Sequence, residues 1–210
     1  MASRGRPRSF SREQALERAL ELFWARGYEG ATLSDLQEAM GGITAPSFYA
    51  AFGSKEGLFR EVVELYSATQ GAPMVTALTQ GTTARASIEG LLRAALAAFF
   101  QRNCPRGCLL VLSAVNCMPE NHGVQEYMRQ QRALRHKLIR QRLERGVTEG
   151  DVPDGTDLTA VATFYATIVD GLALQARDSV SQKALRFVID AAMAAWPELV
   201  RKDQVTSSRS

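Results

Sequence analysis

Residues 32–55 read TLSDLQEAMGGITAPSFYAAFGSK. Thr32 and Thr44 each stand just before a short run of apolar residues at helical spacing, and threonine is a preferred N-cap residue. Gly41-Gly42 ends the first run, and Gly53 ends the second. The stretch therefore predicts two short helices across a tight glycine turn, which is the layout of a helix-turn-helix motif.

A helix is predicted on each side of this pair. Ser11 and Gln14 form a capping-box start, and apolar residues then recur at helical spacing until Gly27, so the first helix is expected over residues 12–26. Ser54 caps a longer fourth helix that fades near residues 71–73. Residues 12–72 are thus interpreted as a helix-turn-helix domain, preceded by a basic flexible arm at residues 1–11.

The rest of the chain keeps the helical period and shows no strand-like alternation. Helices are expected over residues 85–102, 107–117, 121–146, 156–178 and 182–199. The predicted fold is all-α, with a three-helix head joined through the fourth helix to a helical body at residues 73–200. Residues 201–210 are polar and are expected to form a flexible tail.

Composition limits the class of protein. Hydrophobic residues make up 46% and charged residues 22%, which is ordinary for a globular chain, and the net charge is only +3. Residues 1–4 are not followed by an apolar run of secretory length, and no stretch approaches the 18 apolar residues of a membrane span. Three cysteines in one short region fit a reducing compartment better than a disulfide framework. A cytoplasmic protein without membrane contact is expected.

Residues 10–66 resemble the TetR family of transcription regulators. The matching pieces are ALELFWARGYEGATLSDL at 19–36, GGITAPSFYAAF at 41–52 and GSKEGLF at 53–59, in the family's order and spacing. The resemblance covers about the first third of the chain; beyond it only CPRGCLLVLSA at 104–114 is similar to a segment of some members. It implies a homodimer whose third helices enter successive major grooves of double-stranded operator DNA.

Seven head residues are predicted to bind DNA through the resemblance and their helical positions. Tyr49 and Lys55 match residues that hold backbone phosphates, although a buried aromatic ring and a solvated lysine are the plain alternatives. Thr32 and Thr44 are helix caps first, and each hydroxyl or freed amide can also meet a phosphate. Ser47 can bond a base edge, and Ala45 or Ala50 can pack on thymine methyl groups. No bidentate Arg or Asn lies on this helix, so base preferences stay open.

The basic arm is a second predicted DNA contact. Arg4-Gly5-Arg6-Pro7-Arg8 resembles the core of an AT-hook, an extended segment that lies in the narrow minor groove of A·T-rich DNA. A solubilising tail is the alternative. Arg4, Arg6 and Arg8 are the residues expected to bind.

The last two long helices are predicted to form the homodimer interface, as a four-helix bundle, by analogy with the family. Plain core packing is the alternative for each residue. The expected interface residues are Phe164, Ile168, Leu172, Leu185, Val188, Ile189, Ala192 and Trp196. A basic run, Arg129, Arg132, Arg135, Lys137, Arg140, Arg142 and Arg145, is interpreted as a solvated outer helix face.

A small-molecule effector is expected in the body, in a mostly apolar pocket. The predicted lining is Phe99, Phe100, Cys108, Met118, Tyr127 and Phe164, with core packing as the alternative for each. The cysteines Cys104, Cys108 and Cys117 are interpreted as small buried hydrophobic residues. An oxidant- or electrophile-sensing thiol is the alternative.

The sequence therefore predicts a ligand-responsive regulator, most simply a repressor, that binds a palindromic operator and is released or retuned by the effector. No catalytic triad, carboxylate pair, phosphate loop or dinucleotide motif supports an enzyme or a cofactor. His122 and His136 form no ligand cluster with the cysteines, so no metal site is expected. An architectural DNA-binding protein without an effector is a further alternative, in which case DNA would be coated without a discrete site.

Overall fold

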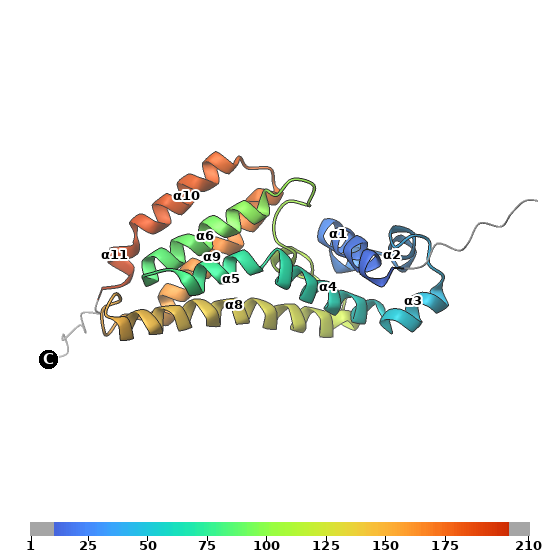
Figure 1. Ribbon diagram of the computed structural model, residues 1–210, viewed down its shortest axis with the longest axis horizontal. Coiled ribbons are helices and arrows are strands. Elements are labelled where there is room, and N and C mark those ends of the chain that lie inside the picture. Colours follow the sequence, from blue (N-terminus) through green and yellow to red (C-terminus); the bar gives the residue numbers. More distant parts are fainter. Residues whose placement is uncertain (1–10, 202–210) are drawn as a thin grey trace, which may run out of the picture.

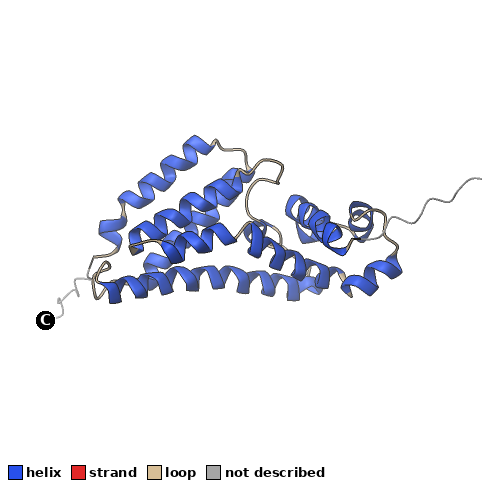
Figure 2. Cartoon of the chain, in the orientation of Figure 1, coloured by secondary structure: helices blue, strands red, loops and turns tan. Residues whose placement is uncertain are grey.

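The computed structural model describes residues 11–201, and this part of the chain contains eleven α-helices, one short 3-10 turn and no strand (Figures 1 and 2). The prediction of an all-α fold is confirmed. The elements are α1 (Arg12–Gly30), α2 (Leu33–Ala39), α3 (Ala45–Phe52), α4 (Lys55–Thr69), α5 (Ala72–Gln80), α6 (Ala84–Phe99), α7 (Leu109–Leu112), η1 (Pro119–Asn121), α8 (His122–Glu149), α9 (Leu158–Arg177), α10 (Gln182–Ala194) and α11 (Trp196–Leu199).

The head consists of α1, α2 and α3 packed around an aromatic core. The ring of Phe23 meets the ring of Phe59 from α4 edge-on, with centroids 5.0 Å apart, and Tyr28 meets the same ring at 5.1 Å. Phe48 and Phe52 point inward from α3 and are buried. These rings fix the angle of α3, because interdigitated aromatic side chains in a close-packed core leave few alternative arrangements.

Helix α4 joins the head to the body. Its N-terminal half supplies Leu58 and Phe59 to the head core, and Tyr66 near its C-terminus lies edge-on to Trp24 of α1 at 5.0 Å. Figure 1 shows α4 running from α3 toward α5 along the lower side of the molecule. Helix α4 therefore packs against the head and leads directly into the body.

The body is a bundle in which the 28-residue α8 lies along one edge and α5, α6 and α9 pack against it (Figure 1). Helix α10 packs on α6 and α9. The inward faces carry aliphatic residues and two fully buried aromatic rings, Phe99 and Tyr165. This core is continuous with the aromatic core of the head, since Tyr66 of α4 contacts both Trp24 of α1 and Cys108 next to α7.

Three elements differ from the sequence-based expectation. Gly71 and Pro73 suggested the end of a helix, yet a new helix, α5, begins at Ala72, since proline is tolerated in a first helical turn. The helix expected over 107–117 shrinks to the four residues of α7, because Gly107 (φ 87°) precedes it and residues 113–118 run as a loop. Helix α1 extends past its expected end, with a break at Gly27 (φ 74°, ψ 176°).

The expectation for the basic run on α8 is also corrected. Arg142 is only 4% exposed, and Arg135 is mostly buried and pairs with Asp170 of α9. The helix packs on neighbours over much of its circumference, so part of its basic run lies inside. Arg129 and Arg140 do face solvent, where each pairs with a glutamate one turn away.

Helix α9 corrects the expectation that no stretch approaches a membrane span. By length and composition alone, Leu158–Arg177 passes as a candidate span. However, Val161, Tyr165, Val169 and Leu172 are buried in the core of the body, where α9 packs against α6 and α8. A core helix of a soluble protein passes the same test, and the packing of α9 is that of a core helix.

Candidate nucleic-acid interface

The turn between α2 and α3 is built from two left-handed glycines. Gly41 has φ 96° and Gly42 has φ 76°, a region that residues with a Cβ rarely adopt. The amides of Gly42 and Ile43 both donate to the carbonyl of Gln37, at 2.9 and 3.2 Å, and so close the end of α2. The chain can therefore turn sharply and start α3 after only a few residues, as a helix-turn-helix requires.

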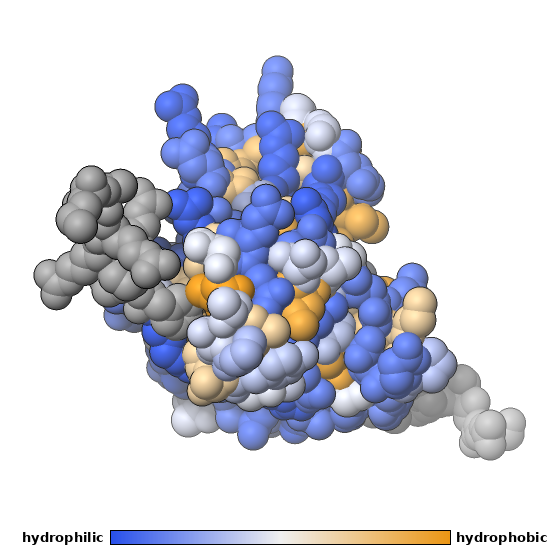
Figure 3. Space-filling model, turned by 90° about the vertical axis from the view of Figure 1, so that its right-hand side faces the viewer, coloured by the Kyte–Doolittle hydropathy of each residue, from blue (hydrophilic) through white to orange (hydrophobic). Residues whose placement is uncertain are grey.

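The outer face of α3 is exposed and almost free of hydrogen-bonding groups. Ala45, Ser47, Tyr49 and Ala50 are all exposed, whereas Phe48 between them is fully buried. The Ser47 hydroxyl lies 3.0 Å from that of Thr44, whose oxygen also accepts the Ser47 amide at 3.4 Å. Figure 3 views the molecule from the end that carries the head, where small hydrophobic spots are interspersed among hydrophilic residues.

Tyr49 lies on the surface of α3. Its side chain is 50% exposed, and its ring rests edge-on against Phe48 with the centroids 5.4 Å apart. The contact with a buried ring limits the rotamers of Tyr49 while the residue remains accessible. The alternative of a buried aromatic with a satisfied hydroxyl therefore does not apply.

Lys55 is less accessible than the sequence suggested. Its ammonium group lies 4.3 Å from the centroid of the Tyr28 ring, a cation–π contact between α4 and α1. Burial lowers the pKa of Lys55, and the nearby Glu29 carboxylate partly opposes that shift. The lysine is held over an aromatic ring at the head surface and is neither freely solvated nor fully inward.

Thr32 acts as a helix cap in the structure. Its hydroxyl oxygen accepts the Asp35 amide at 3.1 Å, and the Asp35 carboxylate accepts the Thr32 amide at 3.1 Å, which completes a capping box. The Thr32 hydroxyl also donates to that carboxylate at 2.6 Å. These hydrogen bonds hold the pKa of Asp35 below its usual value, and Arg26 pairs with the same carboxylate at 3.1 Å. The hydroxyl of Thr32 is thus engaged beside a negative charge, which opposes a direct phosphate contact by that group.

The predicted minor-groove residues Arg4, Arg6 and Arg8 lie outside the described residues. Arg12 is the first arginine that the structure places. Its guanidinium pairs with Glu61 at 2.6 Å and lies 4.9 Å from the centroid of the Phe52 ring. The start of α1 is thereby anchored to α4 and to the end of α3.

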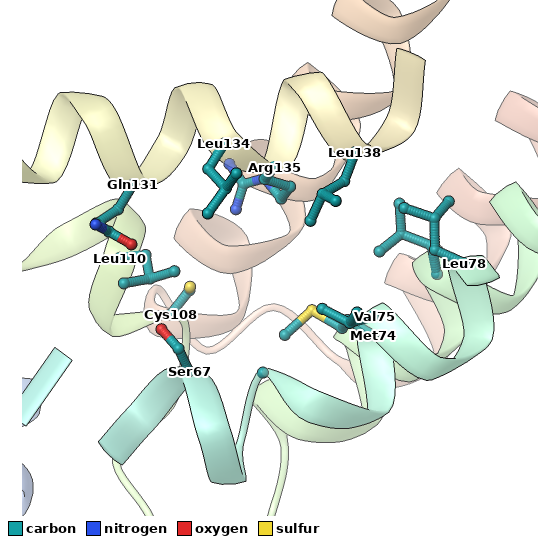
Figure 4. A pocket seen from close by; sticks show the side chains of 12 residues that line it. Ser67, Met74, Val75, Leu78, Cys108, Leu110, Gln131, Leu134, Arg135 and Leu138 are labelled. Carbon is teal, nitrogen blue, oxygen red and sulfur yellow. The ribbon is translucent and has the colours of Figure 1, made fainter. Parts of the chain in front are cut away.

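The body contains a cavity of about 140 Å³ between α4, α5, α6, α7 and α8 (Figure 4). Of the six residues predicted to line an effector pocket, Cys108 alone lines this one. The other five lie elsewhere. Phe99 is buried in the core, Phe164 packs on Tyr165, and Met118 is exposed. The rings of Phe100 and Tyr127 make cation–π contacts with Arg106 and Arg60. Sequence reasoning missed the aliphatic residues of α5 and α8, because their apolar spacing resembles ordinary core packing. The lining is Ser67, Gly71, Met74, Val75, Leu78, Leu91, Cys108, Leu110, Gln131, Leu134, Arg135 and Leu138.

All three cysteines are free thiols. Cys108 is buried, and the Tyr66 hydroxyl lies 3.4 Å from its sulfur. Partial burial raises the pKa of Cys104 and of Cys117, which disfavours the reactive thiolate at both. Within residues 11–201 no three His, Cys, Asp or Glu side chains gather as metal ligands would.

The structure divides the eight predicted interface residues into two groups. Five of them, Leu172, Leu185, Ile189, Ala192 and Trp196, are buried within their own chain. Phe164 and Ile168 are half-buried, and Val188 is 39% exposed. The outward faces of α9 and α10 carry other apolar side chains, notably Leu174 and Phe187, of which Phe187 is 74% exposed. The helical spacing of apolar residues showed that these helices carry apolar faces. It did not show which face packs against the core of the same chain.

Comparison with known proteins places both parts of the chain in one family. Residues 15–62 match the family model described as bacterial regulatory proteins of the tetR family, and residues 84–192 match a tetracyclin repressor-like C-terminal domain. The repressor ComR of Escherichia coli K12 is 32% identical over 200 residues, covering 95% of each chain. The repressor BdcR of the same organism is 29% identical over 86% of each chain.

A solved structure supports the same assignment. A cysteine mutant of the regulator CifR, complexed with 26-bp double-strand operator DNA, is 45% identical, with a TM-score of 0.87. The match covers 91% of this chain and all of that one. The described geometry, with a capped α3 behind a glycine turn and a helical body behind α4, agrees with this relationship. The chain therefore belongs to the TetR family of bacterial transcription regulators, DNA-binding proteins that are not enzymes.

Proposed function

We propose that this protein is a cytoplasmic repressor that binds a palindromic operator as a homodimer and releases it when a small molecule occupies the body. The exposed face of α3, held rigidly over a buried aromatic core, is the observation that carries the proposal. The family membership makes DNA the partner of this face, and the names of ComR and BdcR favour repression over activation.

In this proposal α3 enters the major groove. Ala45 and Ala50 pack on thymine methyl groups, Ser47 meets a base edge, and Tyr49 donates its hydroxyl to a backbone phosphate. Thr44 and Lys55 contact phosphates on either side of α3, and Lys55 leaves the Tyr28 ring to do so. Thr32 supports the head mainly as a cap. Arg4, Arg6 and Arg8 follow the minor groove next to the major-groove site.

The homodimer is proposed to form through the outward faces of α9 and α10. Leu174, Phe187 and Val188 are exposed there, together with the half-buried Phe164 and Ile168. Two copies related by a two-fold axis would bury these residues in a four-helix bundle. Such a dimer presents two α3 helices to half-sites about 34–36 Å apart.

The effector is proposed to bind in the cavity behind α4. Ser67 of α4 lines the cavity directly, and Tyr66 next to it contacts Cys108 on the opposite wall. A molecule that prefers one position of α4 therefore biases the position of the head. Typical coupling free energies between such sites are about 1–3 kcal/mol.

The test is binding of the full-length protein to a duplex selected from a random pool, measured by fluorescence anisotropy and footprinting. We expect one discrete palindromic footprint. Tyr49→Phe should lower the affinity by about 10- to 150-fold, since a hydrogen bond to a charged group contributes about 1.5–3 kcal/mol. Tyr127→Phe removes a hydroxyl on α8, outside α3, and is the matched control. Coating of A·T-rich DNA without a discrete footprint would favour the architectural alternative. Equal affinities of the wild type, Tyr49→Phe and Tyr127→Phe would mean that the Tyr49 hydroxyl does not contact DNA.

A second candidate function, thiol-based sensing, rests on the position of Cys108. Its sulfur lines the cavity beside Tyr66, where an oxidant or electrophile small enough to enter would meet it. Cys108→Ser is the test: if Cys108 senses, peroxide or an alkylating agent lowers operator affinity of the wild type and leaves the variant unchanged. Equal responses of both proteins, or none, would leave Cys108 as a packing residue.

A further inference from the structure

The cavity in the body has a size that selects its occupant. Its volume is about 140 Å³. A dry apolar cavity of about 150 Å³ in another protein binds benzene. A single ring therefore fills it, and a second fused ring would extend into the entrance or displace α5 or α8. An unfilled apolar cavity also lowers stability, so a ligand that fills it stabilises the folded chain.

The two ends of the cavity differ in chemistry (Figure 4). Met74, Val75, Leu78 and Leu138 form one end, which is wholly apolar. Ser67, Cys108 and Gln131 lie at the other end. The Ser67 hydroxyl already donates to the Val63 carbonyl at 2.8 Å, whereas the Gln131 carboxamide has no hydrogen-bond partner among the described residues. One polar group of a ligand can therefore be satisfied, at the Gln131 end.

The one charge at the cavity is balanced within the protein. Arg135 is the charged lining residue, and its Nη2 pairs with Asp170 of α9. Its Nε is buried and has no hydrogen-bond partner among the described residues, so this N–H can donate to an uncharged acceptor. Arg132 donates to the Leu110 carbonyl at 3.1 Å, so that backbone acceptor is also occupied. The Asp170 carboxylate already balances the guanidinium charge, so a buried anion or cation on a ligand would lose its hydration without gaining a counter-ion. The Nε of Arg135 and the Gln131 carboxamide can instead pair with one uncharged polar group.

The cavity is accessible from solvent between α5 and α8. Two of its lining residues, Val75 of α5 and Leu134 of α8, are 44% and 51% exposed. The deeper residues Leu78, Leu91 and Cys108 are almost fully buried. A ligand can thus enter past Val75 and Leu134 while its apolar body becomes buried, which is the arrangement of most small-molecule sites.

From these observations we infer that the effector is a neutral molecule about the size of one six-membered ring. Its apolar body lies against Met74, Leu78 and Leu138, and its single uncharged polar group faces Gln131. This inference rests on the proposed function only in calling the bound molecule an effector. Binding of the molecule depends on the cavity alone. It excludes carboxylates, amines and fused-ring compounds as tight ligands.

The experiment compares matched probes on the full chain by calorimetry and thermal unfolding. The probes are benzyl alcohol, toluene, benzoate, benzylamine and 2-naphthylmethanol. We expect benzyl alcohol to bind and to raise the melting temperature, and benzoate, benzylamine and the two-ring alcohol to bind at least about tenfold more weakly, because a buried unpaired charge or an overfilled cavity is unfavourable. Benzoate binding as tightly as benzyl alcohol would overturn the inference, and so would tighter binding of the two-ring alcohol.

Three variants locate the site. Val75→Trp fills the entrance and is expected to abolish binding of benzyl alcohol and toluene, whereas Val115→Trp, at a similarly exposed residue outside the cavity, keeps both. Gln131→Leu is expected to weaken benzyl alcohol severalfold and to leave toluene unchanged. Unaltered binding by Val75→Trp would place the probes elsewhere and refute the assignment.

Operator affinity is measured on the same samples, so that two failures can be told apart. A wild type that binds its selected duplex but no probe up to the solubility limit overturns the ligand class and leaves the regulator intact. A wild type that binds benzyl alcohol but no DNA overturns the proposed function and leaves the ligand class standing. Release of DNA by benzyl alcohol, absent in Val75→Trp, supports both.

Discussion

At the scale of single residues, Arg142 carries its charge inside the body. Its Nε donates to the Ser87 hydroxyl at 2.7 Å, and its Nη2 donates to the Gly81 carbonyl at 3.4 Å. The carboxylates of Glu149 and Asp151 lie 3.4 and 3.9 Å from the guanidinium. One side chain therefore ties the end of α8 to the loop between α5 and α6, the wall next to the cavity.

Replacing Arg142 with Ala is expected to lower the free energy of unfolding by about 1–3 kcal/mol, because it removes the packing of a buried side chain and leaves the buried Ser87 hydroxyl without its donor. The carboxylates of Glu149 and Asp151 are partly exposed and keep Arg145 and the Ala84 amide as partners. Arg140→Ala, on the same helix, is the matched control. Its pair with Glu144 is exposed and contributes about 0–1 kcal/mol. Urea unfolding followed by circular dichroism measures both. Similar losses in the two variants would mean that the Arg142 cluster adds no stability of its own.

At the scale of elements, the end of α1 is joined to the body by a seam that does not involve α4. The Tyr28 amide donates to the Ser113 carbonyl at 2.7 Å, just after α7. The Glu29 carboxylate accepts the Met118 amide at 2.8 Å and the Asn121 side chain at 2.9 Å. Arg177, the last residue of α9, donates to the carbonyls of Trp24 and Ala25. The head is thus attached to the body twice, once through α4 and once through this seam.

Gly27 is the residue that lets the seam close. Its backbone (φ 74°, ψ 176°) lies in a region that is essentially restricted to glycine, and an added Cβ would lie 3.0 Å from the Ser113 carbonyl oxygen. Gly27→Ala is expected to lower the free energy of unfolding by about 1–3 kcal/mol. Gly30→Ala, where the new Cβ meets only Arg26 at 3.4 Å, is the control. Thermal unfolding distinguishes them, and an unchanged melting temperature in Gly27→Ala would contradict the strain argument.

Glu29 gives the seam a dependence on pH. The hydrogen bonds from Met118 and Asn121 lower the pKa of Glu29 from the usual 4.5. A carboxyl group with a lowered pKa contributes stability that is present above its unfolded-state pKa and is lost as the pH falls through its folded-state value. The difference in unfolding free energy between the wild type and Glu29→Gln should therefore be constant near neutral pH and shrink below pH 4.5. Denaturant titrations across that range measure it.

Glu120→Gln is the control for this prediction, since it removes a nearby exposed carboxylate that accepts no hydrogen bond among the described residues. A difference for Glu29→Gln that stays constant down to the acid transition would mean that the seam is held by the other contacts.

The elements that the sequence predicted well are those defined by local signals. Helices α2, α3 and α4 begin where Thr32, Thr44 and Ser54 were expected to cap them, and all three caps form. A cap depends on residues within one turn, so it can be read directly from the chain. Helix α5 was missed because the same signals, Gly71 and Pro73, serve equally to end one helix or to begin the next.

At the scale of the whole molecule, the sequence could not tell which surfaces meet. Lys55 was expected to face a phosphate, with a solvated side chain as the alternative, and the ring of Tyr28 that it lies over belongs to another helix. The cavity was expected among aromatic residues, whereas its walls are aliphatic side chains from several helices. Helix α9 is apolar on more than one side, so its spacing does not separate the face toward the core from the face toward a partner. Each of these features depends on contacts between distant residues.

The outward face of α10 is an exposed apolar surface that a second copy would cover in the proposed homodimer. A phenylalanine that is 74% exposed, with Val188 beside it and Leu174 on α9, is an unfavourable surface for an isolated chain. A two-fold interface uses every residue twice, so Phe187→Glu introduces two buried carboxylates for each dimer. We expect the dissociation constant of the dimer to rise by at least about 100-fold, or 2.7 kcal/mol.

Analytical ultracentrifugation of Phe187→Glu should therefore show monomers at concentrations where the wild type is a dimer. Operator affinity should fall with it, because a monomer reaches only one half-site. Val115→Glu places the same charge on a surface residue that is 54% exposed and lies outside α9 and α10, and this control should remain dimeric. Circular dichroism establishes that both variants are folded. A Phe187→Glu protein that stays dimeric and binds the operator normally would move the interface to another face of the body.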